Sequence, residues 1–272
     1  MRAGRAWAPD AVRVVAVAEL LAIVCGGLVG FSLALTGGGG STLAVPLLLY
    51  VVGIHDPHMA IGTSALAVSL NAYANLIPHA RAGHVHWRSA FTFAATGVVG
   101  AFAGSEVGKW VNGRQLVGLF AVLVLVVAVL MARPRRRRAG PGTTDAPKRL
   151  GLRLSGTGLG TGAVAGFFGV GGGFLIVPGL MLSARLPIID AIGTSLFGVG
   201  SFGLTTALNY ARSGLIDWPI AGEFILGGVA GGWAGAMLAR HLSTRRGVLN
   251  RIFAALIFAI GVYMLVRTWT GA

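Results

Sequence analysis

The sequence GGGGSTLAVPLLL, at residues 37–49, recurs as GVGGGFLIVPGLM at residues 169–181, with the Val-Pro pairs in register. In each copy a glycine cluster precedes a short apolar segment that contains a proline. Such a segment is too short to cross the hydrocarbon core comfortably, since a spanning helix needs roughly 20 apolar residues. The pattern is typical of half-helices or re-entrant segments, which place interrupted backbone at membrane depth. The two motifs therefore predict a membrane protein with two broken helices.

Other parts of the chain repeat at nearly the same spacing. The sequence AIGTSAL from Ala60 matches AIGTSLF from Ala191, and the pattern Arg-x-Gly-x-x-x-Trp begins at Arg81 and again at Arg212. A constant offset over several blocks indicates an internal duplication, which is common in transporters. We predict a first transmembrane repeat, a basic linker and a second transmembrane repeat, at residues 11–132, 133–150 and 151–269.

The composition excludes a soluble protein. Of the 272 residues, 55% are hydrophobic and 11% are charged, and the mean hydropathy is +0.78; soluble domains carry about 25% charged residues. The 44 glycines suit a bilayer, where small residues let helices pack closely. We therefore predict an all-α polytopic bundle of about eight spanning helices with two short broken or re-entrant segments, or ten spans if the short segments also cross.

The excess positive charge is local. Eight of the 22 basic residues lie between Arg133 and Arg153. By the positive-inside rule this loop is cytoplasmic, in a multi-pass protein of the inner membrane, and it contacts lipid headgroups rather than nucleic acid. Four spans per half would put both termini in the cytoplasm; five would invert the halves and put both termini outside. The N-terminal arginines favour the first arrangement, which we predict, whereas those at residues 240–246 favour the second.

The glycine clusters are the first candidate substrate site. Broken backbone leaves N–H groups without helical partners, and a helix N-terminus with such groups binds anions. A packing role, in which the glycines only let helices cross closely, remains the alternative. The predicted anion-binding residues here are Gly38, Gly39, Gly40 and Ser41 in the first cluster, and Gly171, Gly172 and Gly173 in the second.

The second candidate is the repeated Gly-Thr-Ser triplet. Its hydroxyls can donate to an oxyanion, but they can also bond to their own helix or bridge helices. Amides farther along the same helices would line a cavity or join helices. The predicted substrate contacts are Thr63, Ser64, Asn75, Thr194, Ser195 and Asn209, with Gly62, Gly193, Pro46 and Pro178 as structural residues of the motifs.

Charged residues suggest further roles. Arg81 and Arg212 end matching helices and are predicted to attract anions to a vestibule, unless they only snorkel to the interface. Glu19, Glu106 and Glu223 lie in or near apolar stretches, which leaves proton coupling open. No metal, cofactor, catalytic constellation or disulfide is expected, so we predict that the chain is not an enzyme.

Taken in order, the glycine cluster, the Val-Pro pair and the Ala-x-Gly-Thr-Ser sequence, occurring twice around a polar loop, resemble the sulfite exporter TauE/SafE family of membrane transporters. The resemblance covers about residues 12–267. It implies an inner-membrane permease for sulfite, sulfonates or related organosulfur anions. Its motif residues, carried over one by one, are Gly39, Gly40, Pro46, Gly171, Gly172, Gly173 and Pro178, followed by Gly62, Thr63, Ser64, Gly193, Thr194 and Ser195.

The sequence thus predicts a secondary transporter that exports a small anion held between the two glycine clusters. Each negative charge that moves outward down an inside-negative potential gains about 2.3 kcal/mol per 100 mV, which favours export. The alternatives are a permease for a different small solute, a membrane-embedded enzyme and an assembly subunit.

Overall fold

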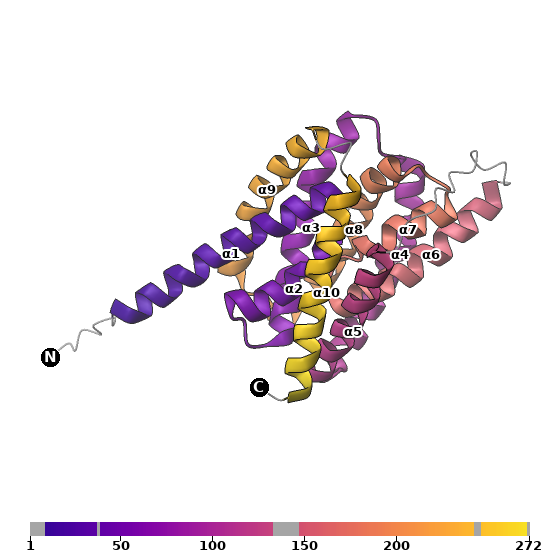
Figure 1. Ribbon diagram of the computed structural model, residues 1–272. Helices are drawn as coiled ribbons and strands as arrows, with labels where there is room; N and C mark the ends of the chain where they lie inside the picture. Colours follow the sequence, from indigo (N-terminus) through magenta and orange to yellow (C-terminus); the bar gives the residue numbers. More distant parts are fainter. Residues whose placement is uncertain (1–8, 37–38, 133–146, 242–245, 271–272) are drawn as a thin grey trace.

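The computed structural model describes residues 9–36, 39–132, 147–241 and 246–270 (Figure 1). Within these ranges every regular element is a helix, which confirms the predicted all-α fold. Residues 133–146 of the predicted linker, Gly38 and residues 1–8 lie outside the described residues. The elements are α1 (Pro9–Thr36), η1 (Gly39–Leu43), α2 (Ala44–Leu47), η2 (Leu48–Val52), α3 (Pro57–Arg81), α4 (Trp87–Trp110), α5 (Gly113–Ala132), α6 (Pro147–Phe168), α7 (Gly173–Ser183), α8 (Ile188–Arg212), α9 (Trp218–His241) and α10 (Arg246–Thr270).

Several helices are long and apolar enough to cross a membrane. Among the described residues they are Val17–Leu35, Pro57–Arg81, Trp87–Trp110, Ile188–Arg212 and Trp218–Met237. Shorter apolar helices cover Gly39–Val52, Gly113–Val129, Gly173–Ser183 and Ile257–Trp269. Length and composition therefore make the chain a multi-pass membrane protein.

Both predicted short segments are present, and each follows a glycine cluster. The first is irregular: a 3₁₀ turn, one α-helical turn and a π-helical turn follow one another, and Gly53 ends them with a left-handed φ of 90°. The second is the 11-residue helix α7, whose N-cap, Gly172, is also left-handed. Pro178 lies inside α7, where its missing N–H removes one helical hydrogen bond. Both segments are thus locally broken helices.

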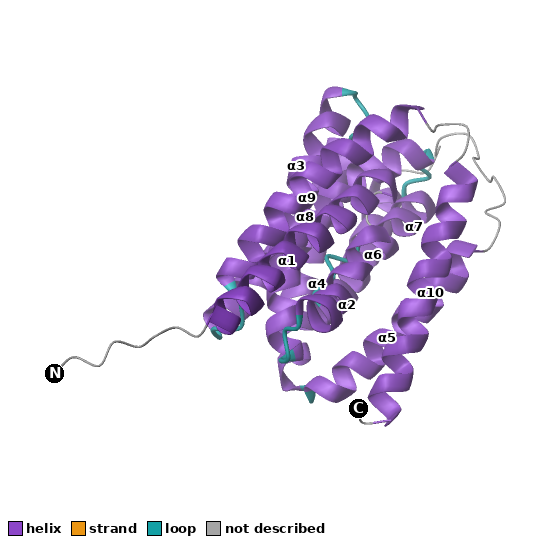
Figure 2. Cartoon of the chain, turned by 60° about the vertical axis from the view of Figure 1, so that its left-hand side comes forward, coloured by secondary structure: helices purple, strands orange, loops and turns teal. Residues whose placement is uncertain are grey.

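The helices pack in pairs around a central pair. Helices α3 and α8 contact each other along the middle of the bundle and carry most of the buried polar side chains. Helix α1 packs against α9, and α6 packs against α4, on either side of this pair. Helices α5 and α10 pack together at one edge (Figure 2).

Glycines bring the outer pairs into backbone contact. A Cβ atom on Gly231 of α9 would overlap the carbonyl oxygen of Gly27 on α1, and one on Gly166 of α6 would overlap that of Ala101 on α4. Such contacts replace the hydrophobic driving force that is missing in lipid. Small residues therefore hold each outer helix to its partner.

The helix directions fix which chain ends lie together. Helix α1 runs parallel to α9, since Gly26 packs on Phe224 and Gly235 packs on Phe31. Helix α10 runs antiparallel to α5, since Thr268 packs on Gly118 and Gly261 packs on Leu125. The start of α1 and the end of α10 consequently lie at one end of the bundle, and the end of α5 and the start of α6 lie at the other (Figure 2).

We call the first of these the terminal end, with helix ends at Trp110, Arg212 and Thr270, and the second the linker end, with helix ends at Arg81, Ala132 and Pro147. This arrangement contradicts the predicted placement of both termini on the side of the linker. The reason is that the first short segment returns the chain to the terminal end before α3 begins.

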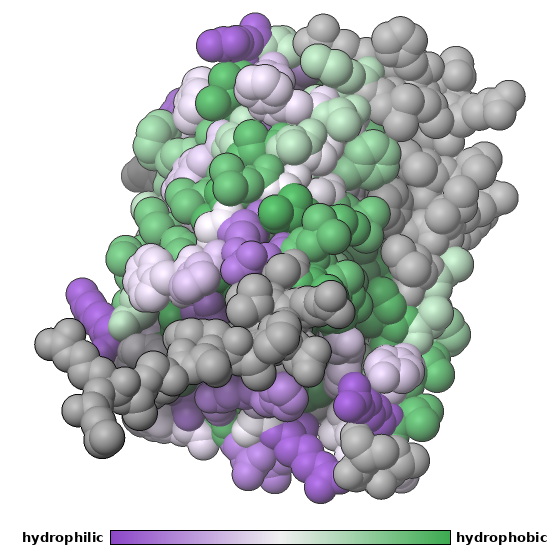
Figure 3. Space-filling view, turned by 90° about the vertical axis from the view of Figure 1, so that its left-hand side faces the viewer, coloured by the Kyte–Doolittle hydropathy of each residue, from purple (hydrophilic) through white to green (hydrophobic). Residues whose placement is uncertain are grey.

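The surface agrees with a bilayer setting. Apolar side chains dominate the middle of the face in Figure 3, and hydrophilic side chains gather at its lower end. Three tryptophans at the terminal end, Trp110, Trp218 and Trp269, are 82%, 63% and 85% exposed. Exposed tryptophans at helix ends are typical of the membrane–water interface.

Candidate substrate site

The first Gly-Thr-Ser triplet joins α3 to the turn that precedes α9. Gly62 allows this contact, because a Cβ atom there would overlap the carbonyl oxygen of Leu215. The Thr63 Oγ1 atom accepts a hydrogen bond from the N–H of Asp217 at 3.0 Å. Both motif residues therefore hold a turn from the other half of the chain.

The second triplet makes the same contacts with the turn that precedes α4. A Cβ atom on Gly193 would lie 2.5 Å from the carbonyl oxygen of His84. The Thr194 Oγ1 atom accepts from the N–H of His86 at 3.0 Å. Because Thr63 and Thr194 accept these bonds, each hydroxyl retains its proton for another acceptor.

The two serines lie deeper, beside the broken helices. The Ser64 hydroxyl is within donating distance of two carbonyl oxygens, that of Ile61 at 2.9 Å and that of Gly169 at 3.2 Å. The Ser195 hydroxyl donates to the carbonyl of Ile192 at 2.8 Å. Both side chains are 0% exposed. Ser64 thus connects α3 to the second glycine segment, from Gly169 to Gly173.

The second glycine segment requires glycine at three positions. Gly169, Gly171 and Gly172 have φ angles of 64°, 67° and 67°, in the left-handed region. The first helical bond of α7 runs from the N–H of Leu175 to the carbonyl of Gly172 at 2.9 Å. The N–H groups of Gly173 and Phe174 precede that bond, so they lie at a helix start without an acceptor in the helix.

The first glycine segment is equally buried. Gly39, Gly40 and Ser41 lie in the 3₁₀ turn η1, whose residues are all buried. The Thr42 hydroxyl donates to the carbonyl of Gly39 at 2.6 Å. Because η1 packs against α7, the two glycine segments approach each other inside the bundle. Pro46 follows in α2 and is buried as well.

The two predicted asparagines lie on separate interfaces. Asn75 donates from Nδ2 to the carbonyl of Asn71 at 3.0 Å, and its amide faces Gly232 of α9. Asn209 faces α4 instead, where its Nδ2 donates to the Ser105 hydroxyl at 2.8 Å. The structure therefore brings the glycine segments and Ser64 together but places both amides apart from them.

Asn209 belongs to a polar cluster that the sequence reading identified only in part. Its Nδ2 also donates to the Glu106 Oε2 atom at 3.0 Å, and its Oδ1 accepts from the Lys109 ammonium at 3.0 Å. Lys109 and Glu106 form an ion pair at 2.6 Å. Glu106 stood out in the sequence as an acidic group near an apolar stretch. Lys109 did not, because a basic residue in the last turn of a helix is ordinary.

The predicted vestibule arginines lie at opposite ends of the bundle. Arg81 ends α3 at the linker end and Arg212 ends α8 at the terminal end, and both are exposed. A cavity of about 620 Å³ opens at the terminal end without either of them. Its charged lining consists of Asp56, Arg114 and Arg267, none of which the sequence reading selected.

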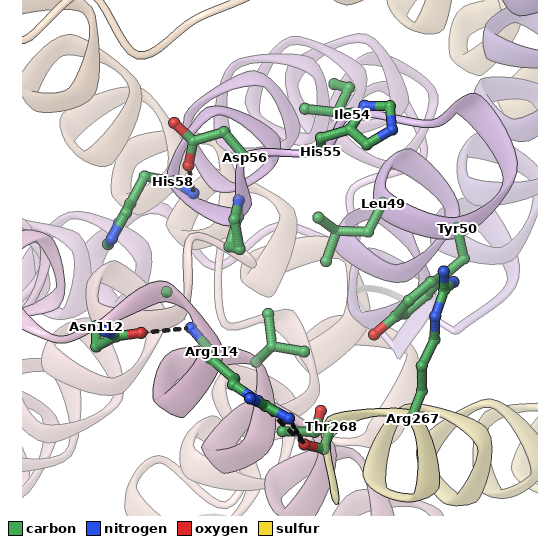
Figure 4. Close-up of a pocket in the computed structure, with 13 residues that line it drawn as sticks. Leu49, Tyr50, Ile54, His55, Asp56, His58, Asn112, Arg114, Arg267 and Thr268 are labelled. Carbon is green, nitrogen blue, oxygen red and sulfur yellow. Dashed lines mark hydrogen bonds between the residues drawn. The ribbon is translucent and has the colours of Figure 1, made fainter. Parts of the chain in front are cut away.

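Figure 4 shows how the cavity is built. Arg114 and Arg267 come from α5 and α10, and His55, Asp56 and His58 lie on the opposite side of the view, in the chain before α3 and in its first turn. Arg114 is held by the Thr268 carbonyl, to which its Nε and Nη2 atoms donate at 3.2 and 3.1 Å. The Arg267 guanidinium lies over the Tyr50 ring, 5.0 Å from its centroid. Two fixed cations thus border a water-accessible space.

At the linker end, a carboxylate joins the two halves. Asp190 lies 3.1 Å from His84 Nδ1 and 3.3 Å from His86 Nε2. In the described ranges, no group of three or more His, Cys, Asp or Glu side chains is arranged to hold a metal ion. These contacts connect α8 to the turn before α4.

Comparison with known proteins gives one family. The family model described as "Sulfite exporter TauE/SafE" matches residues 22–264. A "Probable membrane transporter protein" of Xylella fastidiosa strain Temecula1 is 53% identical over 250 residues, which are 92% of this chain and 96% of the relative. "Probable membrane transporter protein YunE" of Bacillus subtilis strain 168 is 26% identical over 269 residues, covering 90% and 97%. No solved structure matches the chain.

Proposed function

Because the chain belongs to the sulfite exporter TauE/SafE family of membrane transporters, we propose that it is a secondary transporter that exports sulfite or a small organosulfur anion across the inner membrane. The family model covers most of the chain, and relatives that match nearly its whole length are named as transporters. The chain is therefore a membrane transporter and not an enzyme.

The proposed substrate site lies between the two glycine segments, where η1 packs against α7. The observation that carries it is the start of α7, where Gly173 and Phe174 have N–H groups without helical acceptors, in the glycine segment whose Gly169 carbonyl the buried Ser64 hydroxyl contacts. Such a helix start favours an anion through both its N–H groups and its dipole. A small oxyanion needs several donors of this kind once it leaves water.

The substrate must separate groups that are in contact. A Cβ atom on Gly171 would lie 2.9 Å from the Val199 side chain, and one on Gly172 would lie 2.5 Å from that of Ala165. The glycine segments are therefore closely packed. Ser64 would exchange its bond to the Gly169 carbonyl for a bond to the anion, which couples anion binding to a movement of α7.

We further propose that the two halves are inverted repeats. Their partners are exchanged: the first helix of each half, α1 or α6, packs on the fourth helix of the other half, α9 or α4. The triplet contacts are exchanged in the same way, from Thr63 to Asp217 and from Thr194 to His86. Such symmetry supports alternating access around a central site.

The basic linker supports an orientation. If residues 133–150 are cytoplasmic, the terminal end with its cavity faces outward. An anion released there moves with the membrane potential, which contributes about 2.3 kcal/mol per charge per 100 mV. Export then needs no partner ion.

Transport of labelled sulfite and of small sulfonates into proteoliposomes, with and without a pH gradient, tests the function. We expect saturable transport by the wild type. In the Ser64→Ala, Ser195→Ala double variant we expect KM to rise at least tenfold, because a hydrogen bond to a charged group is worth about 1.5–3 kcal/mol.

The control is Ser201→Ala, which removes a hydroxyl on α8 that donates to the Phe197 carbonyl at 2.8 Å. Equal KM values for the double variant and the control would contradict the central site. Failure of folded wild type to move any sulfur anion would refute the substrate class and favour a permease for another solute.

A further inference from the structure

The cluster around Lys109 has the donor set of an oxyanion site. The Lys109 ammonium and the Asn209 amide both bind one oxygen of Glu106, at 2.6 and 3.0 Å. The Lys109 side chain is 16% exposed, and Asn209 is 5% exposed. An ammonium and an amide N–H group on one carboxylate oxygen are the partners that a sulfite or sulfonate oxygen would take.

A buried hydroxyl without a partner lies next to this cluster. Tyr210 follows Asn209 on α8 and is 0% exposed, yet its Oη atom has no hydrogen-bond partner among the described residues. This Oη atom lies 3.3 Å from the position that a Cβ atom on Gly108 would take, and Gly108 directly precedes Lys109 in α4. A buried hydroxyl left unpaired is unfavourable, and more so where no water enters. Tyr210 thus offers a donor that nothing in the described structure uses.

The same place connects the cavity with the glycine segments. The His58 ring lines the cavity, lies 6.5 Å from the Tyr210 ring between centroids, and has a buried Nδ1 atom without a partner in the described part of the chain. On the other side, a Cβ atom on Gly108 would lie 2.8 Å from the carbonyl oxygen of Phe167, two residues before Gly169. Unpaired polar groups therefore lie between the cavity at the terminal end and the residues that precede the second glycine segment.

The cluster is not required by the repeated fold. At the offset of 131 residues that relates the two halves in this region, Glu106 corresponds to Met237, Lys109 to Arg240, Asn209 to Pro78 and Tyr210 to His79. The matching interface, between α3 and α9, therefore lacks the carboxylate and the amide and keeps a basic residue at the position of Lys109. A purely architectural role would not need a glutamate and an asparagine at one of two matching interfaces alone.

We propose that Lys109, Asn209 and Tyr210 form a second anion site at the terminal end, in which the Glu106 carboxylate occupies the place of the substrate's oxyanion until the substrate displaces it. The inference rests on the proposed function and adds to it an intermediate binding site for the anion between the glycine segments and the cavity. Glu106 keeps Lys109 paired when no substrate is present, and it competes with the substrate for the same donors. Competition of this kind prevents the exit site from holding the anion tightly.

Sulfite binding to the purified protein in neutral-lipid nanodiscs, measured by calorimetry, tests the proposal. In Glu106→Gln we expect binding about tenfold tighter than in the wild type, since the competing charge is removed. In the double variant Lys109→Gln, Glu106→Gln we expect no such gain in sulfite affinity, because the ammonium that binds the anion is gone. In Tyr210→Phe with Glu106→Gln we expect binding severalfold weaker than in Glu106→Gln alone.

Two controls separate local from general electrostatics. Glu19→Gln changes the net charge as Glu106→Gln does, at an exposed residue of α1, and should leave sulfite affinity unchanged. Arg88→Gln removes a cation from the exposed start of α4 and matches Lys109→Gln. Equal tightening by Glu19→Gln and Glu106→Gln would overturn the proposal, as would wild-type affinity in Glu106→Gln. Melting temperatures of all variants establish that each is folded.

A lipid headgroup presents similar oxygens, so the binding is repeated in nanodiscs with anionic lipid. A tenfold gain in Glu106→Gln that persists there supports a free sulfur oxyanion as the occupant. Loss of the gain would assign the site to lipid and overturn the proposal. One result would contradict the second anion site but leave the proposed function standing. In that result the wild type transports sulfite, and Glu106→Gln and Lys109→Gln bind and transport it as the wild type does. Wild type that transports no sulfur anion would contradict the proposed function instead.

Discussion

At the scale of single residues, the repeated triplets combine two kinds of role. Thr63 and Thr194 were selected from the sequence as donors to a substrate, and the structure shows their oxygens accepting from backbone N–H groups 154 and 108 residues away. The chemistry of the residues was readable from the sequence. Their partners were not, because a contact between halves leaves no local pattern.

The glycine of the triplet gives a direct test of this contact. In Gly62→Ala the new Cβ atom would overlap the Leu215 carbonyl, so we expect a loss of about 1–3 kcal/mol in stability. Thermal unfolding in detergent measures it. Gly160→Ala in α6, where a Cβ atom meets nothing within 4 Å, is the control and should melt at or slightly above the wild-type temperature. A wild-type melting temperature for Gly62→Ala would show that the turn is not held here.

At the scale of elements, most helices were readable from their apolar runs, and α6 was the exception. It begins at Pro147, inside the range predicted as linker, and it carries Arg153 and several glycines. These lower its hydropathy, so no long apolar run marked it. It is nevertheless part of the bundle, because Gly166 and its neighbours let it pack on α4. Close backbone packing, which hydropathy does not register, defines this helix.

The pairing of α1 with α9 depends on the same feature. In Gly231→Leu the side chain would have to enter the backbone of α1 at Gly27, and we expect destabilisation at or above the upper end of the roughly 1–3 kcal/mol cost of overpacking. Gly222→Leu places the same side chain on the same helix at a position with nothing within 4 Å. Size-exclusion profiles should show a monodisperse protein for Gly222→Leu and aggregation for Gly231→Leu. Similar profiles for both would argue against a glycine-mediated pair.

At the scale of the whole molecule, the sequence supported two topologies, and the structure places the chain termini and the linker at opposite ends of the bundle, unlike the one that the sequence favoured. The choice depended on whether each short segment returns the chain across the bundle, and charges near both termini gave opposite answers. In the structure α1 and the first short segment together bring the chain back to the terminal end, where Pro57 begins α3. Whether a short segment crosses the bundle depends on packing between distant helices. The number of crossings could therefore not be derived from hydropathy.

Cysteine labelling tests this topology in cells. With Cys25→Ala as background, Arg81→Cys and Arg212→Cys place exposed thiols at opposite ends of the bundle. We expect a membrane-impermeant maleimide to label Arg212→Cys in intact cells and Arg81→Cys only after the membrane is opened. Labelling of both from the same side would contradict the inverted arrangement of the halves.

Side-chain bonds between the halves occur at both ends of the bundle. Lys109 holds Asn209 at the terminal end, and Asp190 meets His84 and His86 at the linker end. Opening one end breaks only the bonds at that end while the others act as a pivot. Under the proposed alternating access, the relative strengths of these two sets would set how long the protein rests facing each side of the membrane. A substitution of Asp190 at the linker end should therefore change the resting bias of the carrier without touching the groups proposed to bind its substrate.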